Sequence, residues 1–207
     1  LPFFQRLASW GFVVVGTDDP QAGTGETTSI ALDFVLNESE ITGQIDRDNI
    51  GITGYSQGGA GALGAATKYE NSHLYKAIST GSAAYPLLSI SMGWEYDSSK
   101  ISIPYFMTAA TGASDDMGVA DISKEFGGVA PLASLVEIYN SMTDDVLKVR
   151  ARVTGAEHGE MQVRTDGYMT AWMLYHLQGD QEAGKVFLGE NAEILGNPNW
   201  QDIEKNN

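Results

Sequence analysis

Residues 54–59 read GYSQGG and stand between the apolar run 50–53 and the small-residue segment 60–66. They contain the pattern G-x-S-x-G, in which a serine occupies a sharp turn between a strand and a helix. Only small residues two positions to either side of Ser56 avoid a collision between that strand and that helix. The turn exposes the serine hydroxyl, and the free N–H groups at the start of the helix point toward the same space. We therefore expect Ser56 to be a nucleophile and the N–H of Gln57 to be a donor for an oxyanion.

Short apolar runs alternate with helical patterns along the chain, which predicts an α/β fold with a mostly parallel sheet flanked by helices. The expected strands are residues 12–16, 50–53, 75–79, 105–110 and 147–153, and the expected helices are residues 1–10, 27–36, 58–69, 132–139 and 168–177. In the last strand, apolar residues alternate with Lys148, Arg150 and Arg152. A basic exposed face of this kind is typical of an edge strand. Residues 87–100 form either a cap over the site or an ordinary surface excursion.

Composition excludes several classes of partner and site. A chain of 207 residues predicts one domain, and its 12 basic and 27 acidic residues give a net charge of −15. Nucleic acid and anionic membrane surfaces attract the opposite charge, so neither is an expected partner. Membrane insertion is not expected either, because no apolar run approaches the roughly 20 residues that a spanning helix needs. The absence of cysteine rules out thiol nucleophiles, disulfides and thiolate metal sites, and we expect no cofactor and no metal.

A nucleophilic serine needs a base, and the chain has three histidines. His73 lies in a polar connection and His176 lies within an expected helix, and both positions are typical of surface or packing residues. His158 lies in the loop that follows the alternating strand 147–153. In an α/β sheet, loops at the carboxyl ends of strands form the rim of the site. We therefore predict that His158 removes the proton of Ser56.

The third member of such a triad orients the imidazole and falls between the serine and the histidine in chain order. The expected strand 105–110 precedes Asp115 and Asp116, and both residues meet this requirement. The residues alone leave the choice between them open. Asp18 and Asp19 precede the serine and are interpreted as loop or capping residues. Too few further ligands accompany them for a metal site.

Six segments of the chain, taken in order, resemble the bacterial cutinase and polyester-hydrolase branch of the α/β-hydrolases, which includes the poly(ethylene terephthalate) hydrolases. They read LASWGFVVVGTDD (7–19), IGITGYSQGGAGALGAA (50–66), KAISTGSAAY (76–85), IPYFMTAATGASDD (103–116), GAEH (155–158) and AWMLYHLQGD (171–180). The serine turn is generic to the superfamily, whereas the first and last segments are more particular. The resemblance implies that residues 1–207 form a single α/β-hydrolase catalytic domain whose sheet lacks its first strands.

The resemblance also implies roles for individual residues. Ser56 corresponds to the nucleophile, His158 to the base and Gln57 to an oxyanion donor. Asp115 corresponds to the acid, because the family acid precedes a short apolar stretch. Tyr85 is the nearest match to the aromatic residue that forms one wall of the ester cleft. The chain departs from the family pattern at Gln57, where the family usually has methionine, and in having no disulfide.

These inferences predict a serine carboxylic-ester hydrolase that acts through an acyl-enzyme. The resemblance implies polyester or cutin-like esters as substrates and a secreted, extracellular enzyme. A peptidase or an acyltransferase is the alternative on the same scaffold, since one triad serves several acyl acceptors. A hydrolase-like binding domain without activity, in which the glycine-rich turn only packs a helix against a strand, is the alternative from another class.

An α/β-hydrolase takes its second oxyanion donor from a loop that precedes its first helix. Here that helix is expected to begin at Leu1, so we expect an N-terminal segment with the donor loop and several strands to precede it. A sheet that starts at Phe12 would also leave an apolar strand with one edge unpaired. We interpret the chain as the C-terminal portion of a longer hydrolase.

Overall fold

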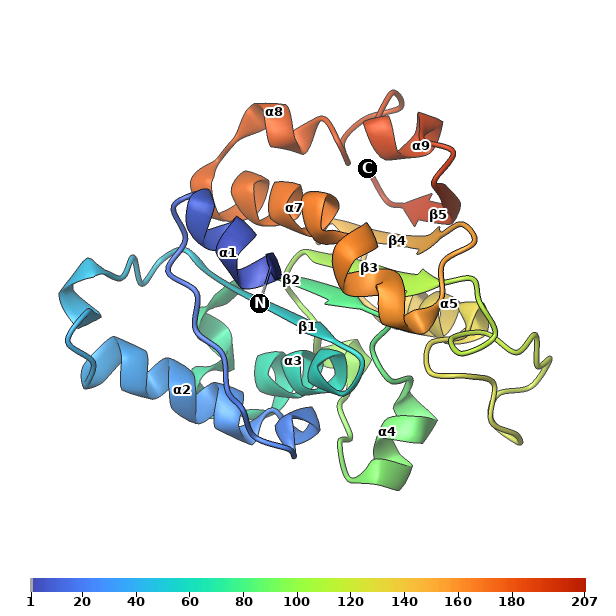
Figure 1. Ribbon diagram of the computed structural model, residues 1–207, viewed down its shortest axis with the longest axis horizontal. Helices are drawn as coiled ribbons and strands as arrows, with labels where there is room; N and C mark the ends of the chain where they lie inside the picture. The colour runs from blue at the N-terminus through green and yellow to red at the C-terminus, as the bar shows by residue number, and fades with distance from the viewer. Residues whose placement is uncertain (1) are drawn as a thin grey trace.

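Residues 2–207, which the computed structural model describes, contain one five-stranded sheet (Figure 1). Its strands are β1 (Ile50–Tyr55), β2 (Tyr75–Gly81), β3 (Tyr105–Ala110), β4 (Lys148–Val153) and β5 (Trp200–Lys205). They lie side by side in chain order, with β1 to β4 parallel and β5 antiparallel to β4. Parallel neighbours need a crossover connection, and helices supply it. The predicted α/β fold with a mostly parallel sheet is confirmed.

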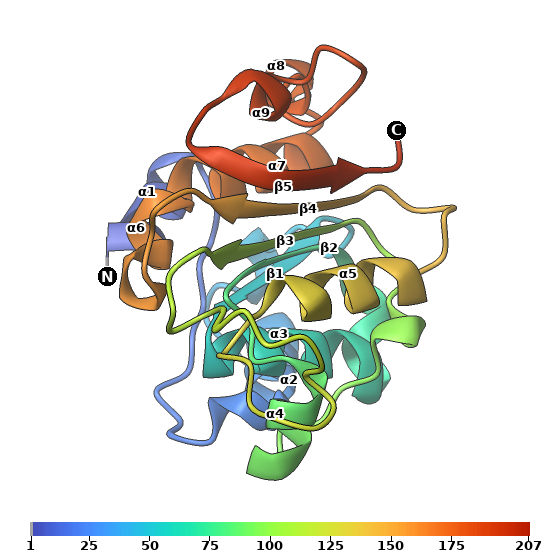
Figure 2. The same ribbon diagram turned by 90° about the vertical axis from the view of Figure 1, so that its right-hand side faces the viewer.

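Helices cover both faces of this sheet (Figures 1 and 2). They are α1 (Pro2–Ser9), α2 (Glu26–Asn37), α3 (Gln57–Lys68), α4 (Pro86–Met92), α5 (Leu132–Ser141), α6 (Met161–Arg164), α7 (Asp166–Gln178), α8 (Gln181–Gly184) and α9 (Glu193–Gly196). On one face α3 contacts β1 and β2, while α5 contacts β3 and β4. On the other face α7 contacts β1 and β2, and α1 packs on α7. The five predicted helices correspond to α1, α2, α3, α5 and α7, and Leu1 lies outside the described residues.

Strand β3 shows why the centre of the sheet is buried on both faces. All six of its residues are buried. Tyr105 and Met107 belong to the apolar cluster that includes residues of α3 and α5, whereas Phe106 and Ala110 belong to the cluster that includes residues of α7. This alternation is the period of two that a strand imposes. Since burying one such large side chain contributes about 1.5–3 kcal/mol, β3 holds the loop that follows it in a fixed position.

Residues 12–16 do not form the strand that their β-branched composition predicts. They form no regular secondary structure, and Val13 and Val15 keep 52% and 47% of their surface exposed. Phe12 and Val14 pack against the cluster beneath α7. A strand exists only where a neighbour accepts its hydrogen bonds, and a cavity separates this segment from β1. The prediction of a buried strand here is wrong for lack of that neighbour.

The prediction that β4 is an edge strand with a solvated basic face is also wrong. Strand β4 pairs with β3 on one side and with β5 on the other, and the sequence pattern did not reveal β5. Lys148 is 2% exposed, and its Nζ donates to the carbonyls of Tyr139 (2.9 Å) and Met142 (3.1 Å). Arg152 is 8% exposed and forms two ion pairs with aspartates. The basic residues of β4 thus serve internal contacts.

Candidate active site

Ser56 occupies the turn that joins β1 to α3. Its backbone has φ +55° and ψ −122°, outside the regions that residues other than glycine normally adopt. Glycine at position 54 permits this turn, because a Cβ there would lie 2.0 Å from the carbonyl oxygen of Gly58. The N–H of Ser56 donates to the carbonyl of Gly81 at 3.0 Å and fixes the turn against the end of β2. Strain of this kind persists where the surrounding structure enforces it, and it is concentrated at functional sites.

The ring of His158 lies between Ser56 and Asp115. Its Nε2 is 2.9 Å from the Oγ of Ser56, and its Nδ1 is 2.5 Å from the Oδ1 of Asp115. Ser56 follows β1, Asp115 follows β3 and His158 follows β4. The ends of three strands, at one edge of the sheet, therefore supply the three residues. The side chain of Asp115 is fully buried, whereas that of His158 is 20% exposed. When Nδ1–H donates to Asp115, the lone pair of Nε2 faces the serine hydroxyl and can accept its proton.

Both oxygens of the Asp115 carboxylate have donors. Its Oδ2 accepts hydrogen bonds from the hydroxyl of Ser82 and from the N–H of Ala110, the latter at 2.7 Å. These donors offset the cost of removing a carboxylate from water. Ser82 is fully buried and has φ +47°, so the backbone is strained there too. Sequence reasoning missed Ser82, although its position directly after β2 puts it at the same edge of the sheet as the other three residues.

Asp116 points away from the imidazole and into an ion-pair cluster. Its Oδ2 is 2.5 Å from Nη1 of Arg152, whose Nη2 is 2.7 Å from Oδ2 of Asp202. The Oδ1 of Asp116 accepts a hydrogen bond from the N–H of Gly118 at 2.9 Å. The sequence left the choice between the two carboxylates open. In the structure Asp115 contacts His158, whereas Asp116 connects the loop to β4 and β5 through Arg152.

Gln57 is the first residue of α3, directly after the serine. No carbonyl within the helix can accept its N–H, because the first four N–H groups of a helix have no intrahelical partner. Its side-chain Nε2 donates to the carbonyl of Pro20 at 2.8 Å. The amide side chain therefore ties the start of α3 to the loop before α2. The role of the Gln57 N–H as an oxyanion donor stays a prediction.

Tyr85 lies close to the serine in the fold but is buried. It is 3% exposed, it precedes α4, and its N–H donates to the carbonyl of Val129 at 3.0 Å. The N–H of the preceding residue, Ala84, donates to the carbonyl of Ser56 at 3.3 Å. In this arrangement the ring of Tyr85 presents almost no surface to a bound ester. Its role as a cleft wall stays a prediction.

The other two histidines are engaged elsewhere. The Nδ1 of His73 is 2.8 Å from the carbonyl oxygen of Glu70. His176 packs in α7 against Trp172, with ring centroids 4.4 Å apart, and against Tyr175. Burial lowers the pKa of His176 to about 4, so the ring is neutral near neutral pH. These positions agree with the interpretation of both histidines as surface or packing residues.

The described part of the chain contains neither a metal-binding group of side chains nor a membrane-spanning helix. Within residues 2–207, no group of three or more His, Cys, Asp or Glu side chains is arranged to hold a metal ion. Among these same residues, no helix has both the length and the apolar character needed to cross a membrane. The contacts around Ser56 are therefore the strongest candidate for a chemical site in this structure.

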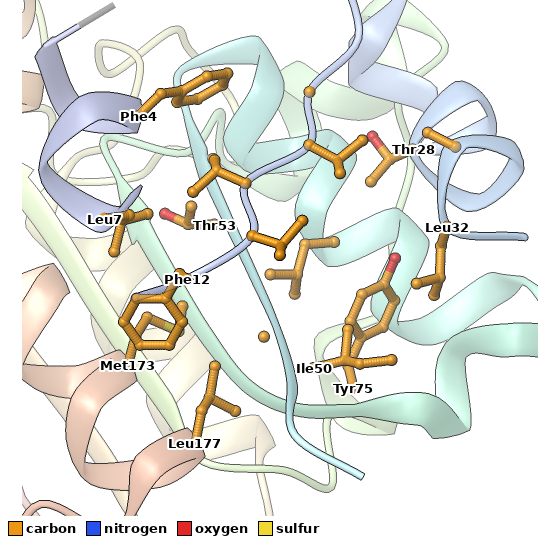
Figure 3. Close-up of a pocket in the computed structure, with 18 of the residues that line it drawn as sticks. Phe4, Leu7, Phe12, Thr28, Leu32, Ile50, Thr53, Tyr75, Met173 and Leu177 are labelled. Atoms are coloured by element: carbon orange, nitrogen blue, oxygen red, sulfur yellow. The ribbon is translucent and has the colours of Figure 1, made fainter. Parts of the chain in front are cut away.

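A cavity of about 650 Å³ lies beside the outer edge of β1 (Figure 3). Residues 11–17 border it on one side and residues 49–55 on the other. Met173 and Leu177 of α7 line it as well, and most of its lining side chains are apolar. The lining does not include Ser56, Asp115 or His158. The cavity is thus a separate feature of the sheet edge.

Comparison with known proteins assigns this architecture. The chain matches the family described as PET hydrolase-like over residues 3–202. It is similar to a bis(hydroxyethyl) terephthalate hydrolase of Streptomyces coelicolor, with 30% identity over 161 residues that make up 74% of this chain and 43% of that protein. It is also similar to cutinase 1 of Thermobifida cellulosilytica, with 25% identity over 189 residues, or 85% of this chain and 62% of the cutinase. The chain spans about half the length of these curated relatives.

Proposed function

Because the chain belongs to the PET hydrolase-like family, we propose that it is a serine carboxylic-ester hydrolase that acts through Ser56, His158 and Asp115. The observation that carries the proposal is the continuous line of contacts across the three residues, 2.9 Å from serine to imidazole and 2.5 Å from imidazole to carboxylate. They follow the chain order serine, acid, histidine that is usual in α/β-hydrolases.

Acylation begins when the Oγ of Ser56 attacks the ester carbonyl and Nε2 of His158 takes the hydroxyl proton. Asp115 accepts the Nδ1–H hydrogen bond and stabilises the imidazolium that forms. The N–H of Gln57 donates to the carbonyl oxygen as it gains negative charge. The tetrahedral intermediate then collapses, the bond to the alcohol oxygen breaks, and His158 returns the proton to that oxygen. The acid part of the ester remains bound to Ser56 as an acyl-enzyme.

Deacylation repeats these steps with water. His158 removes a proton from a water molecule, and the hydroxide attacks the acyl carbonyl. Collapse of the second intermediate releases the carboxylic acid, and Ser56 recovers its proton from His158. No metal or cofactor takes part in either half of this reaction.

The proposed substrates are esters with large apolar groups, such as polyester or cutin-like esters. The relatives are named for a terephthalate ester and for cutin. Several large apolar side chains are exposed on α4 and in the connection between β3 and α5: Leu87, Ile90, Met92, Met117 and Phe126. Exposed apolar groups of this kind favour an apolar ligand. Since such polymers do not enter cells, the proposal includes an extracellular location.

Labelling with a fluorophosphonate, followed by a p-nitrophenyl ester assay, tests the proposed chemistry. The intact mass is expected to rise by one phosphonyl group on Ser56, with loss of esterase activity. The Ser56→Ala variant should neither be labelled nor turn over substrate, whereas Ser72→Ala should behave as the parent chain. The proposal would be contradicted if the Ser56→Ala variant were labelled or if it kept esterase activity. Amide and acyl-acceptor substrates assayed in parallel would detect a peptidase or an acyltransferase.

We also propose that the complete enzyme has an N-terminal segment that adds strands beside β1. Strand β1 pairs with β2 along one edge, and its other edge faces the apolar cavity. Residues 11–17 line the same cavity but form no strand, so the outer edge of β1 has no neighbouring strand within the described residues. Residues 1–207 would then be the C-terminal portion of one catalytic domain, and the segment would carry the second oxyanion donor.

Expression of residues 1–207 with and without an upstream segment tests this second proposal. The added segment should raise turnover by about 10²–10³-fold, the usual cost of a missing oxyanion donor. It should also protect the outward-facing amides of β1 from hydrogen exchange. A 22.2 kDa species that is monomeric and fully active alone would overturn the proposal.

A further inference from the structure

The side chain of Tyr55 joins the strand that carries the serine to the loop that carries the histidine. Tyr55 is the last residue of β1, directly before Ser56. Its hydroxyl donates to the backbone carbonyl of His158 at 2.8 Å, across 103 positions of the chain. Its ring also lies against the imidazole of His158, with centroids 4.9 Å apart and an interplanar angle of 34°. Ser56 and His158 are therefore connected twice, once directly and once through Tyr55.

The loop of His158 has few other fixed points on the side of β1. Glu157 and Glu160 cap its short helical turn reciprocally, and both belong to the loop itself. The carbonyl of Ala156 accepts the N–H of Gly112, which ties the loop to the connection after β3. The hydroxyl of Tyr55 supplies the tie to β1. Ala156 and Met161, at the two ends of the loop, are buried in the apolar cluster that includes residues of α7, and the Tyr55 bond holds the main chain between them at His158 itself.

We propose that Tyr55 is a positioning residue, which keeps the imidazole of His158 in line with Ser56 during turnover. This inference rests on the proposed hydrolase chemistry at the same site. The hydroxyl bond fixes the main chain of His158, and the aromatic face restricts rotation of the ring. When the imidazole becomes cationic, the same face lies beside it, and an aromatic ring attracts a nearby cation.

The chemistry of Tyr55 suits this role over a broad pH range. Burial, together with the negative charge of Asp115, raises the pKa of its hydroxyl above the usual value. The group therefore stays protonated and remains a donor wherever His158 can act as a base.

Replacement of the hydroxyl alone gives a sharp test. Tyr55→Phe keeps the ring against the imidazole and removes the bond to the carbonyl of His158. A matched control is Tyr69→Phe, because the Tyr69 hydroxyl donates to the backbone carbonyl of Thr24 at 3.0 Å, far along α3 from the serine. We expect kcat to fall about 10–100-fold in Tyr55→Phe, since small misplacements of reacting groups have effects of this size. KM should change less than about threefold, and the control should keep its kcat.

A spectroscopic measurement separates positioning from turnover. The Nδ1–H of His158, bonded to Asp115, should give a low-field proton resonance that broadens in Tyr55→Phe and persists in Tyr69→Phe. The two variants should lose similar thermal stability, because each removes one tyrosine-to-carbonyl bond. An unchanged resonance and unchanged kcat in Tyr55→Phe, or equal kcat losses in both variants, would overturn the inference. The resonance reports on Tyr55 even in a chain that hydrolyses no ester, so failure of the proposed function would be recognised separately.

Discussion

The carboxyl ends of the strands and the outer edge of β1 are two contrasting regions of one sheet. At the strand ends, Ser56, His158 and Asp115 contact one another, and each oxygen of the buried carboxylate has a donor. At the outer edge of β1, the backbone faces an apolar cavity, and the neighbouring residues 12–17 form no strand.

The contrast teaches that the contacts among Ser56, His158 and Asp115 can form while the outer edge of β1 has no paired strand within the described residues. The three residues of the proposed triad come from loops after β1, β3 and β4, and β2 lies between β1 and β3 in the sheet. None of Ser56, Asp115 and His158 lines the cavity at the outer edge of β1, whereas Tyr55 borders both regions. We expect substitutions at the strand ends to change chemistry, and substitutions near the cavity to change association or stability.

The largest expected effect follows from removing the nucleophile or the base. Ser56→Ala and His158→Ala should each lower turnover about 10⁶-fold. The unfolding free energy should change little, because Ser56 occupies a strained turn and His158 is partly exposed. Steady-state kinetics and urea unfolding of the same preparations measure both quantities. If the unfolding free energy falls together with turnover, the strand ends contribute to stability as well, and the proposed difference between the two regions is wrong.

The two adjacent carboxylates should differ by orders of magnitude. Asp115→Asn should lower turnover about 10⁴-fold, because the amide cannot orient and stabilise the imidazolium. Asp116→Asn should cost about 1–3 kcal/mol of stability through the weakened bond to Arg152, with a much smaller loss of turnover. A crippled Asp116→Asn beside an active Asp115→Asn would show that the acid is assigned to the wrong residue.

Stability should fall in acid because of His176 in α7, the helix that borders the cavity. The pKa of His176 is about 4 in the folded state and near the usual 6.5 in the unfolded state. The folded state therefore favours the neutral ring more strongly than the unfolded state does. The contribution is therefore fully present above pH 6.5 and is lost as the pH falls from 6.5 through 4. Between pH 7 and pH 4.5 the loss should be about 2 kcal/mol. Urea unfolding should show a flatter profile in His176→Gln and an unchanged one in the control His73→Gln.

Removal of one donor to the acid should have a moderate effect. Ser82→Ala leaves the Oδ2 of Asp115 with the N–H of Ala110 as its remaining donor. We expect kcat to fall about tenfold, the size of one bond to a charged group. Ser79→Ala is a matched control, because Ser79 is equally buried and its hydroxyl donates to Thr53, away from the acid. Equal losses in the two variants would mean that Ser82 acts through packing.

The smallest effect on turnover is expected at the cavity. The double variant Val13→Lys/Val15→Lys places charges on exposed positions that border the unpaired edge. Charges near a free edge discourage association of strands, so light scattering should show less self-association at equal concentration. Turnover per folded chain should change less than about twofold. A large loss of turnover would show that this edge does communicate with the serine.

The sequence predicted the contacts among Ser56, His158 and Asp115 more accurately than it predicted the individual strands of the sheet. The strained serine turn has a pattern with a steric cause, and the strand-end positions of Asp115 and His158 follow from chain order. Residues 12–16 have the composition of a strand, but pairing depends on a neighbour that local sequence does not specify. Strand β5 escaped notice because its residues are mostly polar and Asp202 interrupts it with φ +52°. Ser82 could not be distinguished from other serines before β2 and the loop after β3 were brought together.

The shared cation at Arg152 has an evolutionary consequence. One guanidinium forms ion pairs with Asp116, which is adjacent to Asp115, and with Asp202 in the final strand. A lineage that lost this arginine would leave Asp116 and Asp202 without their shared ion-pair partner. A lineage that lost one aspartate would weaken the selection that maintains the other two residues. We therefore expect correlated substitutions at positions 116, 152 and 202 among homologues. A chain that changes only one of the three residues should be less stable.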